Sequence, residues 1–450
     1  MSLPPALAVG ALYDTLLQSA LRQFFERATL DTEATPSVSS DGRLAIEPTG
    51  DPYALTIRWF GTRYTLRVKG WPFTPHEVRF ARAIGTVLAA RYRAILNPRI
   101  VAERGDLFRG AIEDRYVGAF LDDHAYAIDA REARADRIAS VIELLRVAAL
   151  SSYENRPIST GVLLLGTSDD PCRPDRDRRP AGPAYSESLT GIKSFFRLAD
   201  GVRTVFLANA NGELLDIIDV ERWSGQLCPG EPSTTPCSKS YQPHALATMR
   251  YGHVCAVLSP SREIKVFAEG AEMFAFRDAG WHLLDLRAKY ELWARAVGDA
   301  VLALRLFQTA LDLADSREGA LFVVVREPGV AVPQLVAPGD RLDTPVQRSE
   351  TPSRRDLLHL LAGRSVTDLD ETVLSALATV DGATVIDRAG RLLAAGAILR
   401  HPATVEFEDG GIIEGARTTA AMAASRFGPV LKVSEDGVIT FFDRERVWDI

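Results

Sequence analysis

Three stretches of this 450-residue chain occur twice, in the same order. Each combines apolar runs with turn residues, as strand–turn–strand segments do. The matched stretches are TGVLLLG (160–166) with EGALFVV (318–324), DGVRTVFLANANGELLDII (200–218) with DGATVIDRAGRLLAAGAIL (381–399), and SPSREIKVF (259–267) with SEDGVITFF (434–442), the last at a constant offset of 175 residues. An ordered repeat indicates two copies of one strand-rich α/β unit, and chance similarity between strand–turn–strand patterns is the alternative.

The repeat divides the chain into three regions of a mixed α/β (α+β) fold. We expect residues 291–450 to form a domain with a central mixed sheet flanked by helices. Residues 151–290 would be a degenerate copy of the same unit. Residues 1–150 alternate polar and apolar positions as a small antiparallel sheet does, and Thr74 and Glu77 form a capping box for the helix that follows. We interpret this first region as an α+β sensor.

The composition is that of an ordinary globular protein, with 46% hydrophobic and 25% charged residues. The net charge of −7 argues against a general nucleic-acid coat, which would be basic, but leaves a local basic patch open. The chain has no run of about 18 uncharged apolar residues and starts without a basic segment, so neither a membrane span nor a signal peptide is predicted. We expect a soluble, cytoplasmic protein.

The four cysteines, at positions 172, 228, 237 and 255, form no Cys-x-x-Cys pair, and no histidine pair lies at metal-ligand spacing. A zinc site is therefore not expected. Reduced thiols are the simplest interpretation, and a disulfide between Cys228 and Cys237 is the alternative.

An anion site is suggested by EGARTTAAMAAS at 414–425. Its small residues would let a ligand approach the backbone, and the amides at a helix start suit an anion. Arg417 adds a permanent cation with several hydrogen-bond donors. Glu435, at the end of the next predicted strand, is the kind of carboxylate that holds a metal ion. Together these residues could form two walls of a phosphate site.

The two copies differ at these positions. Glu435 aligns with Pro260, and the first copy has no arginine at the position of Arg417, where the nearest residues are Tyr241 and Gln242. A copy that keeps its apolar pattern but loses its polar site is typical of a non-catalytic partner.

Four motifs of the second copy, taken in order, resemble those of the diadenylate cyclase family, the nucleotidyltransferase domain also found in the DNA-integrity-scanning protein. The resemblance covers about 290–450, with a weaker echo over about 155–280. The motifs are a Gly-Ala-Leu strand at 319–321, Asp-Gly-Ala at 381–383, a helix start at 415–421 that the family writes Gly-Thr-Arg-His-Arg-Ala-Ala, and a strand end at 433–436 that the family writes Val-Ser-Glu-Glu.

The resemblance implies that two ATP molecules, one per protomer, face each other and condense into cyclic di-AMP with release of pyrophosphate. It implies Mg²⁺ or Mn²⁺, which hard oxygen ligands hold, with Asp381 and Glu435 as catalytic residues and metal ligands. Because the degenerate copy cannot supply the second site, it also implies a homo-oligomer. The residues implied in nucleotide binding are Gly382, Ala383, Leu399, Gly415, Arg417, Thr418, Thr419 and Ser434.

The chain departs from the family pattern at the helix start. Ala416 stands for the family's threonine, and Thr418 and Thr419 stand for the His and second Arg of its Arg-His-Arg triplet. Hydroxyl groups can bond phosphate oxygens but bring no charge. The sequence therefore leaves two functions open: an active cyclase, or a protein that binds a nucleotide or cyclic dinucleotide as a sensor.

Overall fold

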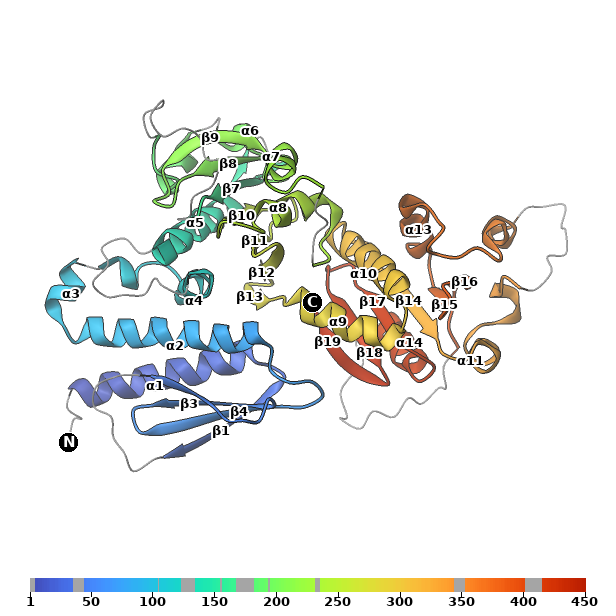
Figure 1. The fold of residues 1–450 in the computed structure, drawn as a ribbon, viewed down its shortest axis with the longest axis horizontal. Helices are drawn as coiled ribbons and strands as arrows, with labels where there is room; N and C mark the ends of the chain where they lie inside the picture. The colour runs from blue at the N-terminus through green and yellow to red at the C-terminus, as the bar shows by residue number, and fades with distance from the viewer. Residues whose placement is uncertain are drawn as a thin grey trace. The chain divides into compact units, whose positions relative to one another are not determined.

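A computed structural model shows two compact units in the chain (Figure 1). Unit 1 comprises Met1–Ser233 and Pro243–Asp285, and unit 2 comprises Thr234–Gln242 and Leu286–Ile450. The structure describes residues 5–34, 44–103, 105–122, 134–153, 156–166, 182–192, 195–230, 235–343, 353–400 and 415–450.

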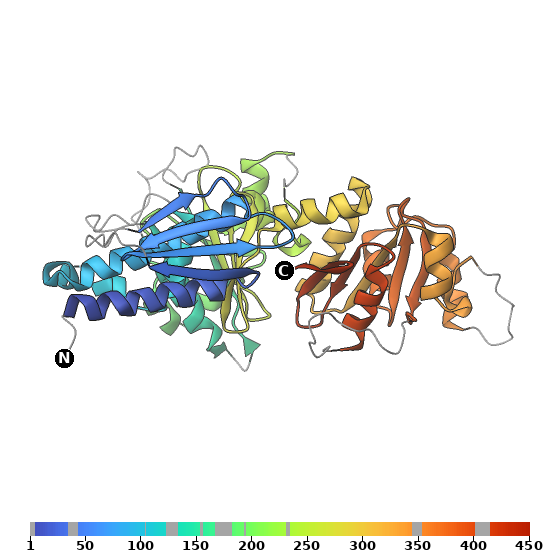
Figure 2. The ribbon, with the colours of Figure 1, turned by 90° about the horizontal axis from the view of Figure 1, so that it is seen from below.

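Unit 1 begins with two helices beside a four-stranded antiparallel sheet of order β1-β4-β3-β2 (Figures 1 and 2). The predicted capping box is present at the start of the second helix: Thr74 Oγ1 accepts from the amide of Glu77, and the Glu77 carboxylate accepts from the amide of Thr74. The elements are α1 (Pro5–Phe24), β1 (Ala28–Ala34), β2 (Ala45–Pro48), β3 (Ala54–Trp59), β4 (Thr62–Val68) and α2 (Pro75–Ile95).

The rest of unit 1 is built around a seven-stranded mixed sheet of order β13-β12-β11-β10-β7-β8-β9, with a separate two-stranded pair, β5-β6. Its strands are β5 (Ser152–Tyr153), β6 (Arg156–Pro157), β7 (Thr160–Leu164), β8 (Thr204–Ala208), β9 (Leu214–Asp219), β10 (Val254–Leu258), β11 (Ile264–Ala268), β12 (Ala271–Arg277) and β13 (Gly280–Leu283). Its helices are α3 (Pro98–Glu103), α4 (Ile112–Leu121), α5 (Arg134–Ala149), α6 (Phe195–Leu198), α7 (Val220–Leu227) and α8 (Gln242–Ala247).

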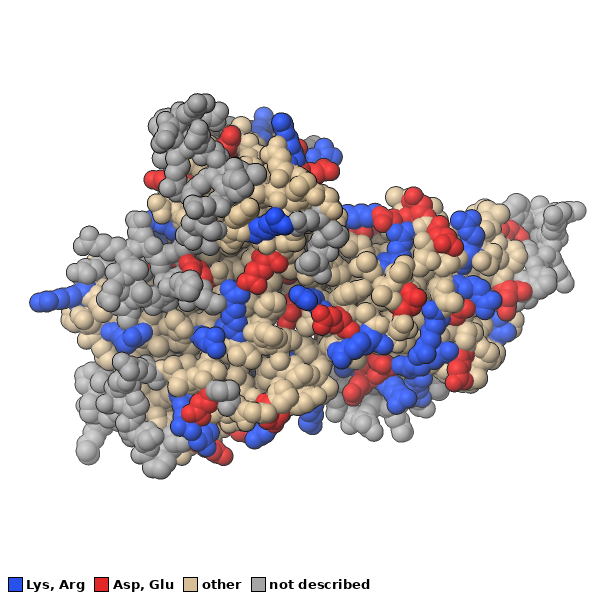
Figure 3. Space-filling view, viewed as in Figure 1, with Lys and Arg blue, Asp and Glu red and all other residues tan. Residues whose placement is uncertain are grey.

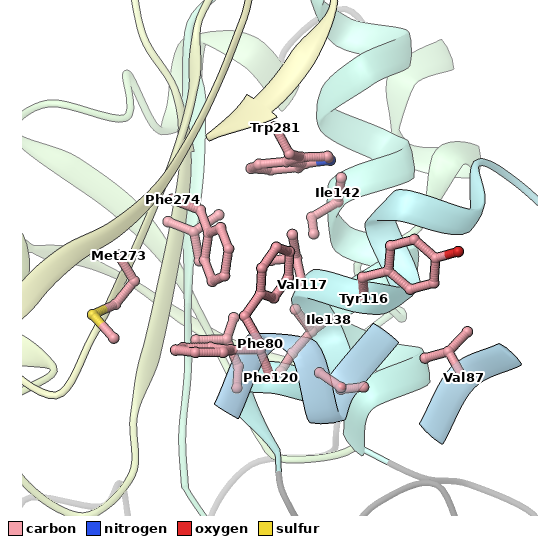
Figure 4. Close-up of a cluster of buried hydrophobic side chains, with 14 of the residues drawn as sticks. Phe80, Val87, Tyr116, Val117, Phe120, Ile138, Ile142, Met273, Phe274 and Trp281 are labelled. Carbon is pink, nitrogen blue, oxygen red and sulfur yellow. The ribbon is translucent and has the colours of Figure 1, made fainter. Parts of the chain in front are cut away.

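One hydrophobic core joins the helices of residues 1–150 to the seven-stranded sheet. Phe274 of β12 lies 5.1 Å from Phe80 of α2 and 5.0 Å from Phe120 of α4, between ring centroids (Figure 4). Trp281 of β13 donates from its indole nitrogen to the buried carboxylate of Asp114 at 2.8 Å. Such contacts explain why Met1–Ser233 and Pro243–Asp285 form one compact unit, although the sequence pattern predicts a boundary near residue 150.

Unit 2 contains a six-stranded mixed sheet of order β16-β15-β14-β17-β18-β19. Helix α14 lies across one face of it (Figure 2). The strands are β14 (Ala320–Val325), β15 (Ala383–Asp387), β16 (Leu392–Ala397), β17 (Val430–Val433), β18 (Ile439–Asp443) and β19 (Glu445–Asp449). The helices are α9 (Leu286–Val297), α10 (Ala300–Asp315), α11 (Pro328–Leu335), α12 (Arg354–Leu358), α13 (Glu371–Ala378) and α14 (Ala416–Ser425).

The two large sheets have the same topology. In each, a central parallel pair (β7 with β8, β14 with β15) is extended on one side by an antiparallel strand and on the other by an antiparallel meander. The turn after β10 repeats the turn after β17: the amide of Arg262 donates to the carbonyl of Ser259 as that of Gly437 donates to Ser434. Both turns are left-handed at this position, with φ of +67° at Arg262 and +87° at Gly437.

The strand register corrects one detail of the sequence alignment. Thr160 pairs with Leu258 and Ala320 pairs with Val433, so Thr160 corresponds to Ala320. The alignment of TGVLLLG with EGALFVV is therefore shifted by two residues, because short apolar runs match one another in several registers.

The predicted fold class can be compared directly with the observed sheets and helices. The mixed α/β fold with helix-flanked sheets is confirmed, whereas the three domains with boundaries at 150 and 290 stay a prediction. Cys228, Cys237 and Cys255 are buried, and Cys172 lies outside the described residues. Over the described ranges, no helix combines the length and the apolar character that a membrane crossing requires.

Candidate functional site

One edge of the six-stranded sheet collects the ends of four strands. β14 and β15 are parallel and begin at this edge, whereas β16 and β17 are antiparallel to them and end there. Ala320, at the start of β14, pairs with Val433, and Ala383, at the start of β15, pairs with Ala397. The structure thus brings the Asp-Gly-Ala segment, the Gly-Ala-Leu segment and the Ser434–Glu435 strand end to one edge.

Helix α14 begins close to the same edge. Its N-cap, Gly415, has φ of +92°, which glycine adopts without the steric cost that a Cβ would add. No side chain caps the helix. The Gly415 carbonyl accepts from the amides of Thr418 (3.2 Å) and Thr419 (3.3 Å), and the Thr419 hydroxyl donates to it as well, at 3.4 Å.

Arg417 extends from α14 across the start of β14. A Cβ on Gly319 would lie 2.2 Å from Arg417 Nη1, so glycine at this position makes room for the guanidinium. The same Nη1 lies 3.5 Å from Glu435 Oε1, with 37% of the arginine side chain and 74% of the glutamate side chain exposed. An ion pair this exposed is weak, so either partner can exchange the other for a ligand.

The turn before β15 is held by backbone contacts. Gly382 has φ of +114°, and a Cβ there would lie 2.4 Å from the carbonyl carbon of Gly396, so only glycine fits. Arg354 donates to the carbonyl oxygens of Asp381 (2.8 Å) and Gly396 (2.6 Å). The Asp381 side chain is exposed, and its carboxylate accepts no hydrogen bond within the described ranges. The turn is fixed while its carboxylate stays available.

Two predicted nucleotide-binding residues belong to the core. Ala383 is 1% exposed and Leu399 is 7% exposed, and both pack in the apolar cluster between the sheet and its helices. Their side chains therefore belong to the core beneath the sheet edge, and only their backbone atoms could contact a ligand. Ser434 is half-buried at the strand end, where its amide donates to Val438 and its carbonyl accepts from Gly437.

Sequence reasoning missed Lys432 and Arg354. Lys432 of β17 donates from Nζ to Thr418 Oγ1 at 3.1 Å, which brings a second cation to the start of α14. Burial lowers the pKa of Lys432, Asp436 opposes that effect, and Arg446 and Arg417 add to it. A lysine inside the apolar strand Val-Leu-Lys-Val was a visible signal for the first residue, but nothing near Arg354 in the sequence links it to the Asp381 turn.

The donor set fits a hard divalent cation in type. Asp381 and Glu435 carry exposed carboxylates at the same sheet edge, and Mg²⁺ or Mn²⁺ commonly takes one or two carboxylates plus phosphate oxygens and water. No group of three or more His, Cys, Asp or Glu residues suited to a metal exists among the described residues. Two protein carboxylates would therefore need ligand oxygens to complete the coordination.

The corresponding edge of the seven-stranded sheet is closed. Asp200 accepts from the amides of Val202 (2.9 Å), Arg203 (2.8 Å) and Thr204 (2.9 Å); burial alone would raise the pKa of Asp200, but these hydrogen bonds lower it. His244 is fully buried, with Nε2 3.0 Å from the carbonyl oxygen of Gly201, and burial lowers the pKa of His244 to about 4. The Asp200 carboxylate and the Nε2 atom of His244 are thus both bonded within the protein.

Comparison with known proteins does not assign the chain to a family. No protein-family model matches the chain, and no curated protein is significantly similar to it. A solved structure with some similarity is a double mutant of DacA from Staphylococcus aureus, at 20% sequence identity and a TM-score of 0.21, over 33% of this chain and 86% of that one. A TM-score this low does not establish a shared fold.

Proposed function

We propose that unit 2 is a nucleotidyltransferase of the diadenylate cyclase type, which condenses two ATP molecules into cyclic di-AMP and releases pyrophosphate. One observation carries the proposal: four separate motif segments converge on one sheet edge, where Arg417 faces Glu435 across Gly319. Random motif matches would have no reason to meet in space.

Each group has a role that its position allows. Arg417 and the hydroxyls of Thr418, Thr419 and Ser434 bind phosphate oxygens, and the α14 amides at Gly415 add partial positive charge. Asp381 lies near the 3′-hydroxyl that attacks the α-phosphate of the opposing ATP and holds that hydroxyl in place. A divalent metal at Asp381 and Glu435, when bound, neutralises phosphate charge during the displacement.

The reaction needs two sites face to face, because one domain presents one α-phosphate to one hydroxyl. The first copy has Pro260 where the second has Glu435, and it has no arginine that matches Arg417, so we propose that the second site comes from another chain. We propose a homo-oligomer that forms at least transiently, in the cytoplasm, where ATP is abundant. Over the described part of the face in Figure 3, basic and acidic side chains are interspersed, which does not favour nucleic acid as the partner.

The second candidate is a sensor that binds a nucleotide without consuming it. Thr418 and Thr419 favour it, since the chain carries hydroxyls where the family carries charge. Tight ATP binding without pyrophosphate release would support this candidate.

The test is to incubate the full chain with ATP, GTP and their mixture plus Mg²⁺ or Mn²⁺, and to identify products by mass spectrometry. Wild type should form cyclic di-AMP, with a rate per chain that rises with protein concentration. Asp381→Asn should abolish product while the melting temperature stays unchanged, because its carboxylate makes no contact within the described protein. Product formation at the wild-type rate by Asp381→Asn would contradict the proposed site.

A further inference from the structure

Lys432 occupies a core position of β17. It stands opposite Leu321 of β14 and Thr440 of β18, on the face that α14 covers. Val430, two residues earlier on the same face, packs with Ala421 and Ala424 of the helix. The pattern of the strand would place an apolar residue at position 432, yet the chain has a lysine there.

The first copy has a different pair of residues at the positions of Lys432 and Thr440. At the constant offset of 175 residues, Val257 takes the place of Lys432, and Lys265 takes the place of Thr440. Lys265 Nζ lies 3.3 Å from Glu272 and 3.9 Å from Glu263, and all three residues are buried. In that copy the buried cation is neutralised by carboxylates of the protein.

In the second copy the cation has no such partner. Within the residues that the structure describes, no salt bridge joins Lys432 to a carboxylate, and its ammonium donates to the neutral hydroxyl of Thr418. Asp436 attracts the ammonium without a salt bridge to it, whereas Arg417, the residue before Thr418, repels it, and partial burial costs further free energy. A phosphate bound beside Lys432 would offset the burial and the repulsion from Arg417.

We infer that Lys432 is a phosphate-binding residue of the unit 2 site, acting with Arg417 on the triphosphate of the bound nucleotide. Thr418 holds the lysine ammonium at the helix start. Lys432 thereby supplies from the strand the positive charge that Thr418 and Thr419 do not supply from the helix. This inference rests on the proposed nucleotide site but not on cyclic di-AMP being its product.

The test compares wild type with Lys432→Met, which keeps the length of the side chain and removes its charge. Calorimetry on the full chain would use three probes: ATP, inorganic triphosphate and adenosine. A charge-assisted hydrogen bond to phosphate predicts that Lys432→Met binds ATP and triphosphate about 10- to 100-fold more weakly. Adenosine affinity should stay unchanged, and Lys432→Arg should retain most of the triphosphate affinity.

Arg426→Gln is the matched control. It removes a positive charge at the other end of α14, about 14 Å along the helix from Arg417, so triphosphate affinity should not change. Thermal unfolding adds a check on the fold: Lys432→Met should melt at or above the wild-type temperature, because it removes a half-buried charge that has no salt bridge within the described residues.

The outcomes separate the two proposals. Unchanged triphosphate affinity in Lys432→Met, or a parallel loss of adenosine and triphosphate affinity with a lower melting temperature, overturns the role of Lys432. Lysine-dependent triphosphate binding without any cyclic product supports the role and leaves only the proposed synthesis in error. If wild type binds neither ATP nor triphosphate, both proposals are wrong.

Discussion

The seven-stranded and six-stranded sheets share strand order, strand direction and turn geometry, but their equivalent edges have opposite character. In unit 1, Asp200 at this edge caps its own loop, and Lys265 inside the sheet pairs with Glu272. In unit 2 the Asp381 carboxylate has no hydrogen-bond partner within the described ranges, and Arg417 and Glu435 form one exposed ion pair.

In a repeated fold, the copy whose polar groups lack protein partners is the one expected to bind a ligand. Polar groups that satisfy one another stabilise a protein and need no ligand. Polar groups left exposed, or half-buried without a salt bridge, contribute little to stability and are retained at a cost. By that criterion unit 2 carries the site and the sheet of unit 1 is a support.

The largest expected effect is on cyclic di-AMP synthesis, when Glu435 of the second copy is replaced by proline, the residue that the first copy has at position 260. Glu435→Pro should lower cyclic di-AMP synthesis at least about 100-fold, because it removes a proposed metal ligand and the partner of Arg417. The turn itself should survive, since Pro260 occupies the same position of the equivalent turn, and Ser259 and Ser434 make the same backbone bonds. Product assays with thermal unfolding would measure both effects.

Pro260→Glu is the reciprocal variant. It should neither create activity nor change the melting temperature, because Asp200 and His244 keep the first edge closed. A gain of synthesis in Pro260→Glu would show that the first copy lacks only one residue for activity. The view that its edge is closed by Asp200 and His244 would then be wrong.

The sequence predicted much of this arrangement because its signals are local. The Asp381–Ala383 and Ser434–Glu435 segments flank short apolar strands, and a mixed sheet brings such ends to one edge. Register and burial are not local. The lysine at 432 could be placed beneath α14 only once β17 was paired with β14, and the two-residue shift at Thr160 has the same origin.

The shared core of unit 1 lies beyond sequence reasoning for a similar reason. Phe80, Phe120 and Phe274 are far apart along the chain, and each fits a separate amphipathic pattern. Only their packing shows that the first 150 residues and the first sheet form one compact unit. The role of Arg354 could not be predicted either, because its hydrogen bonds to the carbonyl oxygens of Asp381 and Gly396 join residues that are distant in the sequence.

The second prediction concerns stability and contrasts the two lysines. Lys265→Met should destabilise unit 1 by about 3–5 kcal/mol, because it removes the cation that neutralises the buried Glu263 and Glu272. Lys432→Met should cause no such loss. Urea denaturation of both variants of the full chain measures the difference, and equal destabilisation would contradict the view that only the first lysine is structural.

A third prediction uses pH. The pKa of His244 is lowered to about 4, from 6.5, because the ring is buried. As pH falls below about 6.5 the unfolded chain takes up a proton before the folded chain does, so this part of the stability is complete above 6.5 and is lost towards pH 4, by at most roughly 3 kcal/mol. Denaturation at pH 7.5 and 4.5 should show a smaller pH effect in His244→Gln. An equal pH effect in both proteins would mean that His244 is not held neutral.

The smallest expected effect is on the free energy of unfolding, and it compares the loop before β9 with the equivalent loop before β16. In the loop before β9, Asn209 Oδ1 accepts from the amides of Asn211 and Glu213, both at 3.0 Å, and Asn209 Nδ2 donates to Glu213 at 2.7 Å. In the loop before β16, Asp387 Oδ1 accepts from the amides of Ala389 (3.0 Å) and Arg391 (2.8 Å), and Arg391 donates to the Asp387 carboxylate at 3.1 Å.

The two loops thus share the same backbone hydrogen bonds. They differ in the side-chain pair, which is an asparagine with a glutamate in the first loop and an aspartate with an arginine in the second. Asn209→Asp alone would set two carboxylates side by side and should cost under about 1 kcal/mol, the range of exposed ion pairs. Adding Glu213→Arg recreates the pair of the second copy and should restore the wild-type free energy of unfolding. A double-mutant cycle in urea would measure the coupling. If the double variant stayed as unstable as Asn209→Asp, the loops would not be interchangeable, and the likeness of the two sheets would end at their backbone.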